Sequence, residues 1–506
     1  MPTDNDALGR AEARRDRVLQ ETNFESSAAV ENAPSVSHDV ENPNGTADGA
    51  QSSNDNALKT SAPPASTTRV LAPDLLRGTL MVLMAMDHAV VAIRSWDHGQ
   101  AHESEGDSTP VSEWNRPIGY IIRTFTHLCA PGFTFLLGMG VVYFGRSRTR
   151  LGWSTYQMLR HFIIRAVVLT LITVLMGVVF TGGKIWFLNA VLFALAIDYV
   201  LAGMLWSVLD KIEAATTQCL KDYFKRNHES GETTPLLVSS LEGIRNSDKA
   251  STRAIAISWH FSNGILVALS VITACPWKPD TGHLVLAHHV GPYHVGVSPM
   301  AWLSFAIMGL LYGRLVQVRP LSPARLNTST LLVALAFFLL FAFTRIFRFG
   351  NLSEGCLHMP EHVAHPDRNP YLASVPSFFY VIKYPPDVAF IAYTMSVNLS
   401  LLALFGALPS GVTKRFTILL TYGTSALFFY LVHQLILFSA GAVLARFFGR
   451  ETGETDPFTG QPTVVVENIW IYWGLWATAL AILYPLCRWY SGFKKTKGPD
   501  SIWRFF

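Results

Sequence analysis

Ten long apolar stretches constrain this chain more than any other feature of its sequence. Each is long enough to cross about 30 Å of hydrocarbon as a helix. We therefore predict an all-α polytopic membrane protein, a bundle of about ten transmembrane helices, at residues 70–94, 118–144, 160–180, 184–209, 255–275, 299–318, 328–348, 387–408, 416–446 and 467–489. The ninth stretch is too long for one straight span, so we expect it to kink or to extend past the interface.

The composition supports a membrane protein and excludes several other classes. Only 15% of the 506 residues are charged and 50% are hydrophobic, whereas a soluble protein carries roughly 25% charged residues. The net charge of +4 is spread along the chain, which argues against a nucleic-acid binder. The five cysteines show no CxxC spacing, so neither structural zinc nor a disulfide scaffold is expected. Cys275 and Cys356 could still meet on the outer side.

The chain divides into a tail, a membrane domain and a short C-terminal segment. Residues 1–68 are rich in Ser, Asn, Asp, Ala and Glu, which predicts a disordered cytosolic tail. Residues 69–490 form the predicted transmembrane domain, with a cytosolic loop at 210–253, and 491–506 form a second cytosolic tail. Lysines and arginines concentrate in alternate loops, and this asymmetry predicts that both termini are cytosolic.

Charged and imidazole side chains inside the first span are candidates for function, because such groups are costly within a bilayer. Arg77 and His88 are eleven residues apart, so they share one helical stripe and are separated by roughly 16 Å along the axis. Asp74 precedes Arg77 by three residues and is placed to pair with it. Asp87 points to a different face and could equally be a structural partner for another helix.

Two more histidines and one arginine are predicted at the depth of His88. His127 lies in the second span, His433 in the ninth and Arg345 in the seventh. Histidine can take and return a proton near neutral pH, and arginine can stabilise a developing oxyanion. The alternative is that these residues face different neighbours and never meet. Pro131 is expected to bend the second span beside its histidine.

Other polar residues favour structural interpretations. Asp198 and Asn398 lie mid-span and are expected to hydrogen-bond neighbouring helices, with a polar cavity as the alternative. The stretch from His358 to His362 formally fits the HxxEH zinc pattern. That pattern needs a continuous helix, and Pro360 lies inside it. No metal site is therefore expected.

Two short motifs bear on location. Asn351-Leu-Ser353 is a glycosylation sequon on the predicted outer side. The stretch from Glu232 to Leu237 matches the acidic dileucine pattern that sorting adaptors read, and it lies in the predicted cytosolic loop. The dileucine pattern suggests a multi-pass protein of the vacuole or lysosome, and a glycan at Asn351 would support the predicted topology.

Four blocks of the sequence resemble a known family. They are DLLRGTLMVLMAMDH at 74–88, RTFTHLCAPGFTFLLG at 123–138, KYPPD at 383–387 and YGTSALFFYLVHQ at 422–434. In this order they resemble the bacterial and fungal relatives of the heparan-alpha-glucosaminide N-acetyltransferase catalytic domain, in the transmembrane acyltransferase superfamily. The likeness extends over about residues 70–490.

The resemblance implies a bundle of about ten helices that uses cytosolic acyl-CoA to acylate a sugar on the far side of the membrane. Arg77 and His88 also match the Arg-x10-His pattern of the related acyltransferase-three group. There the histidine is taken to be catalytic, and the arginine to help with CoA binding or helix packing. His127 and His433 fall within matched blocks and are carried over as catalytic candidates.

The sequence also departs from the family. The lysosomal enzyme has asparagine where His88 stands, and its active histidine lies three residues before a Trp-Asn pair. This chain keeps that pair as Trp114 and Asn115, but Val111 occupies the histidine position. Asp387 replaces the serine of the usual KYPPS block. Because the acetyl-accepting histidine is missing, direct transfer is our hypothesis.

We therefore predict a membrane acyltransferase that moves an acyl group, expected to be acetyl, from cytosolic acyl-CoA to a hydroxyl or amine of a sugar-like acceptor. His88 would be the general base, with His127 or His433 assisting. Substrate-binding candidates are Arg77, Asp74, Asp87, Arg345 and Lys383. The expected partners are the acyl donor, the acceptor, membrane lipid and a second copy in a homodimer, without nucleic acid or metal. The alternatives are a transporter, for which no internal repeat is visible, and a non-catalytic relative.

Overall fold

The computed structural model describes most of the chain from Leu71 onward. The described residues are 71–95, 111, 117–184, 186–189, 191–229, 239–274, 288–290, 293–295, 299–318, 322–383, 386–455, 462–498 and 503. The predicted tail 1–68 and the dileucine motif lie outside these residues, as do Cys275, Trp114 and Asn115. The membrane domain forms one compact unit, Leu71–Lys494.

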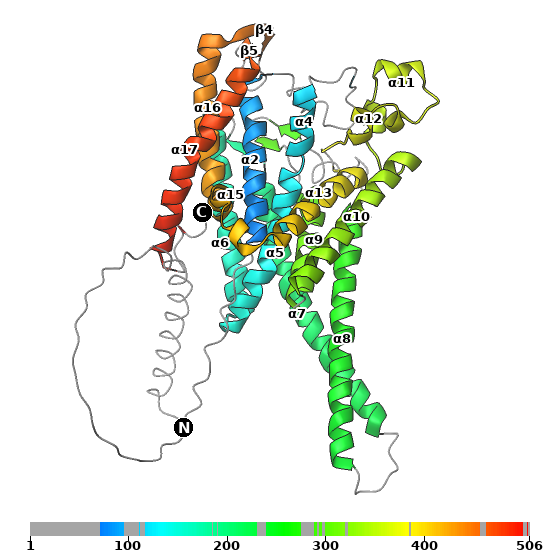
Figure 1. The fold of residues 1–506 in the computed structure, drawn as a ribbon. Coiled ribbons are helices and arrows are strands. Elements are labelled where there is room, and N and C mark those ends of the chain that lie inside the picture. Colours follow the sequence, from blue (N-terminus) through cyan, green and yellow to red (C-terminus); the bar gives the residue numbers. More distant parts are fainter. Residues whose placement is uncertain are drawn as a thin grey trace, which may run out of the picture. The chain divides into compact units, whose positions relative to one another are not determined.

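The prediction of an all-α polytopic membrane protein is confirmed. Within the described residues, nine helices are long and apolar enough to cross a membrane. The main helices (Figure 1) are α2 (Ala72–Ile93), α4 (Pro117–Thr126), α5 (Cys129–Arg150), α6 (Thr155–Thr181), α7 (Leu192–Glu229), α8 (Ser239–Ala274), α9 (Pro299–Val318), α10 (Pro323–Phe347), α13 (Val388–Ala407), α15 (Thr417–Thr424), α16 (Ala426–Phe448) and α17 (Ile469–Lys495). The predicted span at 299–318 corresponds to α9.

Two of the predicted spans are interrupted helices. The second consists of α4 and α5, with a turn at His127 and Leu128. Pro131 has no N–H, so the carbonyl of His127, four residues earlier, has no helical donor. This explains the break and confirms the expected bend. The ninth predicted span breaks at Ser425, between α15 and α16, in agreement with its excess length.

Four predicted boundaries differ from the structure. The fourth span was predicted from residue 184, but a short strand, β1 (Phe187–Asn189), precedes α7. Both α7 and α8 continue as helices into the predicted cytosolic loop 210–253, and α17 continues into the predicted tail 491–506. Hydropathy detects only the apolar part of a helix. Charged helix formers such as lysine and glutamate extend these helices without adding an apolar signal.

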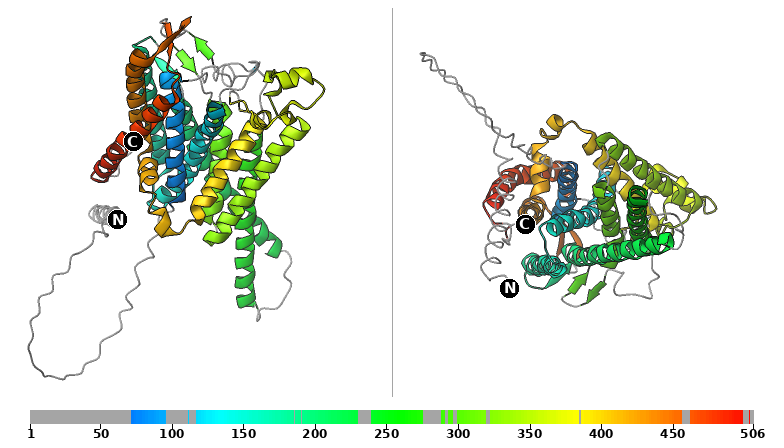
Figure 2. Two further views of the ribbon diagram at one scale, coloured as in Figure 1. Left: turned by 45° about the horizontal axis from the view of Figure 1, so that its top comes forward. Right: turned by 90° about the horizontal axis from the view of Figure 1, so that it is seen from below.

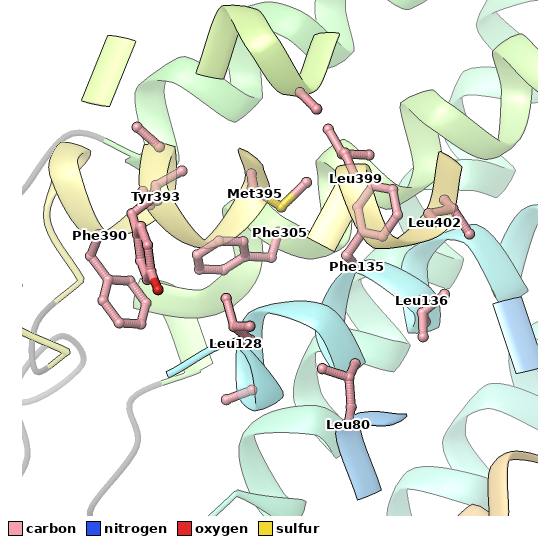
Figure 3. Close-up of a cluster of buried hydrophobic side chains, with 14 of the residues drawn as sticks. Leu80, Leu128, Phe135, Leu136, Phe305, Phe390, Tyr393, Met395, Leu399 and Leu402 are labelled. Carbon is pink, nitrogen blue, oxygen red and sulfur yellow. The ribbon is translucent and has the colours of Figure 1, made fainter. Parts of the chain in front are cut away.

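A buried apolar cluster joins the centre of the bundle. Most of its members come from α2, α5, α9, α10 and α13, with Leu128 at the break between α4 and α5 (Figure 3). Phe305, Phe135 and Phe390 are almost completely buried there. Because burial of a large apolar side chain contributes about 1.5–3 kcal/mol, this cluster fixes the spans that surround the candidate site.

The flanks of the bundle are apolar and exposed. On α6 and α10, Leu171, Leu175, Leu332 and Leu339 each have more than half of their surface uncovered. Figures 1 and 2 both show α17 and α10 on opposite flanks of the bundle. A chain with such broad apolar faces is stable only in a solvent such as lipid, which supports an integral multi-pass protein.

Short elements lie at the end of the bundle where α11 and α12 are drawn in Figure 1, and we call this the cap end. Strand β3 (Tyr293–Val295) pairs parallel with β1 and antiparallel with β2 (His288–Val290). The hairpin of β4 (Arg450–Thr455) and β5 (Pro462–Val465) follows α16. The segment 350–383 includes α11 (Pro360–Ala364) and α12 (Val375–Phe379). By the charge asymmetry of the loops, this end is predicted to face outward.

Candidate functional site

Two of the predicted catalytic histidines make direct contact. Nδ1 of His88 on α2 lies 2.7 Å from Nε2 of His433 on α16. The ring planes are inclined by 11° and the ring centroids are 4.9 Å apart. The centroid distance exceeds the N···N distance by about two ring radii, so the rings meet edge to edge rather than face to face. The contact is therefore an in-plane hydrogen bond.

The neighbouring backbone sets the direction of this hydrogen bond. Nδ1 of His433 lies 3.0 Å from the carbonyl oxygen of Phe429. A carbonyl only accepts, so Nδ1 of His433 carries its proton, and in the neutral ring Nε2 is then the acceptor. Nδ1 of His88 must consequently donate to His433. This arrangement leaves Nε2 of His88 as the unprotonated nitrogen of the pair, which is the form required of a general base.

The burial of the two rings differs. His433 is completely buried and His88 is half-buried. The rings of Tyr430 and Phe429 pack against His433, with centroids at 5.8 Å and 5.3 Å, and Tyr430 also lies edge-on to His88 at 6.5 Å. His433 is thus enclosed by aromatic side chains, while His88 keeps part of its surface exposed.

Helix α17 fixes the position of α2 beside His88. Trp476 Nε1 donates to the carbonyl of Val82 at 3.4 Å, and the Tyr472 hydroxyl donates to the carbonyl of Met86 at 3.3 Å. Sequence reasoning missed both residues. Their signal was present, because a tryptophan or tyrosine within a span needs a partner for its polar atom.

Arg77 lies further along α2, as the sequence predicts. Its Nη1 donates to Asp74 at 3.0 Å, which confirms the predicted pair, and lies 3.4 Å from the carbonyl of Gly423 on α15. The two helices approach closely here. A Cβ added at Gly423 would be 2.0 Å from the carbonyl oxygen of Asp74, and one at Gly78 would be 2.0 Å from that of Leu419. Glycine is therefore required at this crossing.

His127 is buried at the break between α4 and α5. Its ring lies edge-on to Phe390 of α13, with centroids 5.6 Å apart, so it belongs to the α13 side of the site. Asn398 on α13 donates to the carbonyl of Leu128 at 3.2 Å and to that of Thr394 at 2.9 Å. This confirms the structural role predicted for Asn398, which ties the broken span to α13.

Asp87 and Lys383 share one electrostatic neighbourhood. Both interact electrostatically with the buried thiol of Cys129 at the start of α5, and Asp87 also interacts with Tyr472. Asp87 and Lys383 are each half-buried. A carboxylate and an ammonium from segments far apart in the sequence thus both interact with the thiol at the start of α5.

The guanidinium of Arg345 is engaged by the fold, and its predicted role in substrate binding stays a prediction. Its Nη1 donates to Asn351 at 2.7 Å and to Ser353 at 3.3 Å, and its Nη2 donates to the carbonyl of Tyr380 at 2.7 Å. The guanidinium also lies 4.4 Å from the centre of the Tyr371 ring. These contacts hold the cap segment 350–383 against α10. The depth of Arg345 suggested a substrate-binding residue, but its side chain is used by the fold.

The sequon residue is also used by the fold. The amide nitrogen of Asn351 donates to the carbonyls of Thr344 at 2.7 Å and Phe349 at 3.3 Å, while its oxygen accepts from Arg345. An N-linked glycan would replace one of these N–H groups. Both N–H groups of Asn351 are thus engaged by backbone carbonyls at the end of α10, and a glycan at this sequon would displace one of them.

The imidazoles of His358 and His362, in the HxxEH stretch, contact different partners. Helix α11 begins at Pro360, so His358 is outside it. His358 contacts the carbonyl of Gly355 at 3.0 Å, whereas His362 contacts Ser377 at 3.1 Å. Over the residues that the structure describes, no group of three His, Cys, Asp or Glu side chains is arranged to hold a metal ion.

No model of a known protein family matches this sequence, and no curated protein matches it either.

Proposed function

We propose that this protein is a membrane acyltransferase. It would move an acyl group, expected to be acetyl, from cytosolic acyl-CoA to a hydroxyl or amine of a sugar-like acceptor on the far side of the membrane. The observation that carries the proposal is the hydrogen-bonded pair of His88 and His433 within the bundle. The four sequence blocks that resemble the family support the same reaction.

In the proposed reaction, Nε2 of His88 takes the proton from the acceptor O–H or N–H as its oxygen or nitrogen attacks the thioester carbonyl. The new C–O or C–N bond forms and the C–S bond breaks. The leaving CoA thiolate then takes the proton back from the His88 imidazolium, which gives CoA–SH and restores the base. No oxidant or external proton is needed, so the atoms and charges balance.

His433 would act as a positioning residue in this reaction. Its Nδ1–H is held by the Phe429 carbonyl, so its Nε2 is available to accept from His88. This bond fixes the tautomer of His88, and it strengthens when His88 becomes an imidazolium, because hydrogen bonds to charged groups are stronger than neutral ones. A second base is not required.

Arg77 would bind the phosphate-bearing part of CoA. Its side chain keeps 29% of its surface exposed although it pairs with Asp74. The roughly 16 Å between Arg77 and His88 along the helix suits a donor whose charged end stays toward the cytosol while its thioester reaches the base. Asp87 and Lys383 would orient the polar groups of the acceptor. His127 remains a catalytic candidate on the α13 side.

The proposal also includes a location. Both termini would be cytosolic, so that the cap end faces a lumen or the exterior, and the dileucine motif favours the vacuole or lysosome. A homodimer in that membrane remains an expectation from the sequence.

The test measures acetyl transfer directly. The purified protein in proteoliposomes is given acetyl-CoA with glucosamine as the first acceptor probe, and CoA thiol release is followed. His88→Ala should lower kcat by about 10²–10⁴-fold, the usual contribution of a general base. His161→Ala is the matched control, because His161 also lies within a span but packs against Phe144 on α5. Full activity in His88→Ala would reject the assignment.

One observation favours a second candidate, an ion-coupled transporter. Asp198 on α7 is completely buried, and neither of its carboxylate oxygens has a hydrogen-bond partner among the described residues. Buried acids of this kind often mark proton or ion pathways in membrane proteins. Proton uptake that follows a substrate gradient, without CoA release and abolished in Asp198→Asn, would favour transport over acyl transfer. A protein that neither binds acetyl-CoA nor moves protons would be a non-catalytic relative.

A further inference from the structure

A cavity lies at the cap end of the bundle, between α4 and α12. Its volume is about 430 Å³, which falls within the range of roughly 300–1,000 Å³ that is usual for small-molecule sites. Ile121 and Phe125 line it from α4, and Val375 and Phe379 line it from α12. This cavity is separate from the pair of histidines, and the proposed reaction does not use it.

The polar atoms in the walls are already engaged by the protein. The Tyr120 hydroxyl donates to the carbonyl of Pro376 at 2.7 Å, which joins the two walls, and the Thr124 hydroxyl donates to the carbonyl of Tyr120 at 2.8 Å. Arg123 turns the other way, toward the carbonyl of Val381. The walls therefore offer a ligand apolar contacts, with neither charge nor a dedicated hydrogen-bond donor.

The cavity opens toward the surface that faces lipid. Ile118, Ile121 and Phe125 form one stripe of α4 and are 44%, 51% and 48% exposed, and Val375 is 74% exposed. The helix α4 is part of a candidate membrane span, Pro117–Arg150. The cavity is thus continuous with an exposed apolar stripe on a helix of a candidate membrane span.

We propose that this cavity holds one hydrocarbon chain of a membrane lipid. The apolar lining offers neither water nor a polar ligand a hydrogen-bonding group that the protein does not already use. A lipid chain matches the chemistry of the walls and can enter sideways from the bilayer. The chain would pack between α4 and α12 and so steady α4, which has only ten residues and is separated from α5 by the break at His127.

The experiment uses the full chain in nanodiscs of phosphatidylcholine doped with a phosphatidylcholine that carries a diazirine on its acyl chain. After irradiation, the labelled peptides are mapped by mass spectrometry. Peptides of α4 and α12 should carry several-fold more adducts than those of the exposed face of α10. Ile121→Trp should fill the cavity and remove this excess. Leu332→Trp, at a 61% exposed position on α10, should leave it unchanged.

Two results would overturn the proposal. One is equal labelling of the α4–α12 surface and the α10 face, which would mean ordinary contact with bulk lipid. The other is an excess that persists in a folded Ile121→Trp protein. If that variant does not fold, as judged by size-exclusion chromatography, Val375→Trp replaces it, because Val375 lies on the opposite wall and is more exposed. Neither result depends on whether the protein transfers acetyl groups.

Discussion

Replacing His433 by leucine removes the acceptor for Nδ1 of His88 while keeping an apolar side chain of comparable size in α16. The Nδ1···Nε2 distance of 2.7 Å is that of a good hydrogen bond. A bond between neutral groups contributes about 0.5–1.5 kcal/mol, and one to a charged group about 1.5–3 kcal/mol. The bond to His88 therefore gains about 1–2 kcal/mol when His88 takes the acceptor proton. That gain is lost in the leucine variant.

We expect kcat to fall by about 5- to 30-fold in His433→Leu, since 1.36 kcal/mol corresponds to a factor of ten in rate. KM for acetyl-CoA should stay unchanged, because the lost interaction strengthens only as charge develops. The assay is thiol release from acetyl-CoA in the presence of glucosamine, with thermal unfolding in detergent as the folding control. A purely structural role for His433 would not produce this separation of kcat from KM.

Conservative variants sharpen the test. A glutamine at 433 can place its amide oxygen near the position of the imidazole Nε2, so His433→Gln should keep most of the activity. An asparagine places its amide near the Nδ1 position, where it can bond the Phe429 carbonyl but does not reach His88. His433→Asn should then behave like the leucine variant. Wild-type kcat in His433→Leu, or more activity in the asparagine than in the glutamine variant, would refute the hydrogen-bond direction.

Three further predictions follow from the contacts of the fold. Arg345→Leu should lower the free energy of unfolding by at least about 1.5–3 kcal/mol, the contribution of one hydrogen bond to a charged group, and thermal unfolding in detergent measures this loss. Gly423→Ala should lower Tm and weaken acetyl-CoA binding measured by calorimetry, because its Cβ would meet the Asp74 carbonyl; Gly474→Ala, which has open space, is the control. Because backbone carbonyls engage both N–H groups of Asn351, endoglycosidase treatment should leave the electrophoretic mobility of the wild-type protein unchanged, and a shift that disappears in Asn351→Gln would contradict this reasoning.

The helices could be predicted from the sequence because a membrane span is recognised by its length and hydropathy. Even the two interrupted spans carried a local signal, a proline in one and excess length in the other. Hydropathy could not predict that α7 and α8 continue as helices beyond their apolar parts. There the sequence turns to charged residues that suit a helix as well as a loop.

The depth of the candidate residues along their helices could be predicted from the sequence, but the side to which each side chain points could not. The positions of His88, His433 and Arg345 along their helices suggested a common layer. Which side chains meet in that layer depends on the rotation of each helix about its axis and on the neighbours it packs against. His88 and His433 face each other in the structure, whereas the side chain of Arg345 contacts the cap segment. The bond from His433 to the carbonyl of Phe429 was accessible from the sequence, because the two residues are four apart on one helix.

Both broken spans carry a histidine of the candidate set, His127 at the turn before α5 and His433 in the half that follows Ser425. At a break the ladder of backbone hydrogen bonds is already interrupted, so the two halves can change their relative tilt at a small cost. An unbroken helix would have to give up hydrogen bonds within lipid to bend in the same way. The two histidines therefore lie on spans that can bend with a smaller loss of backbone hydrogen bonds than a continuous helix would suffer.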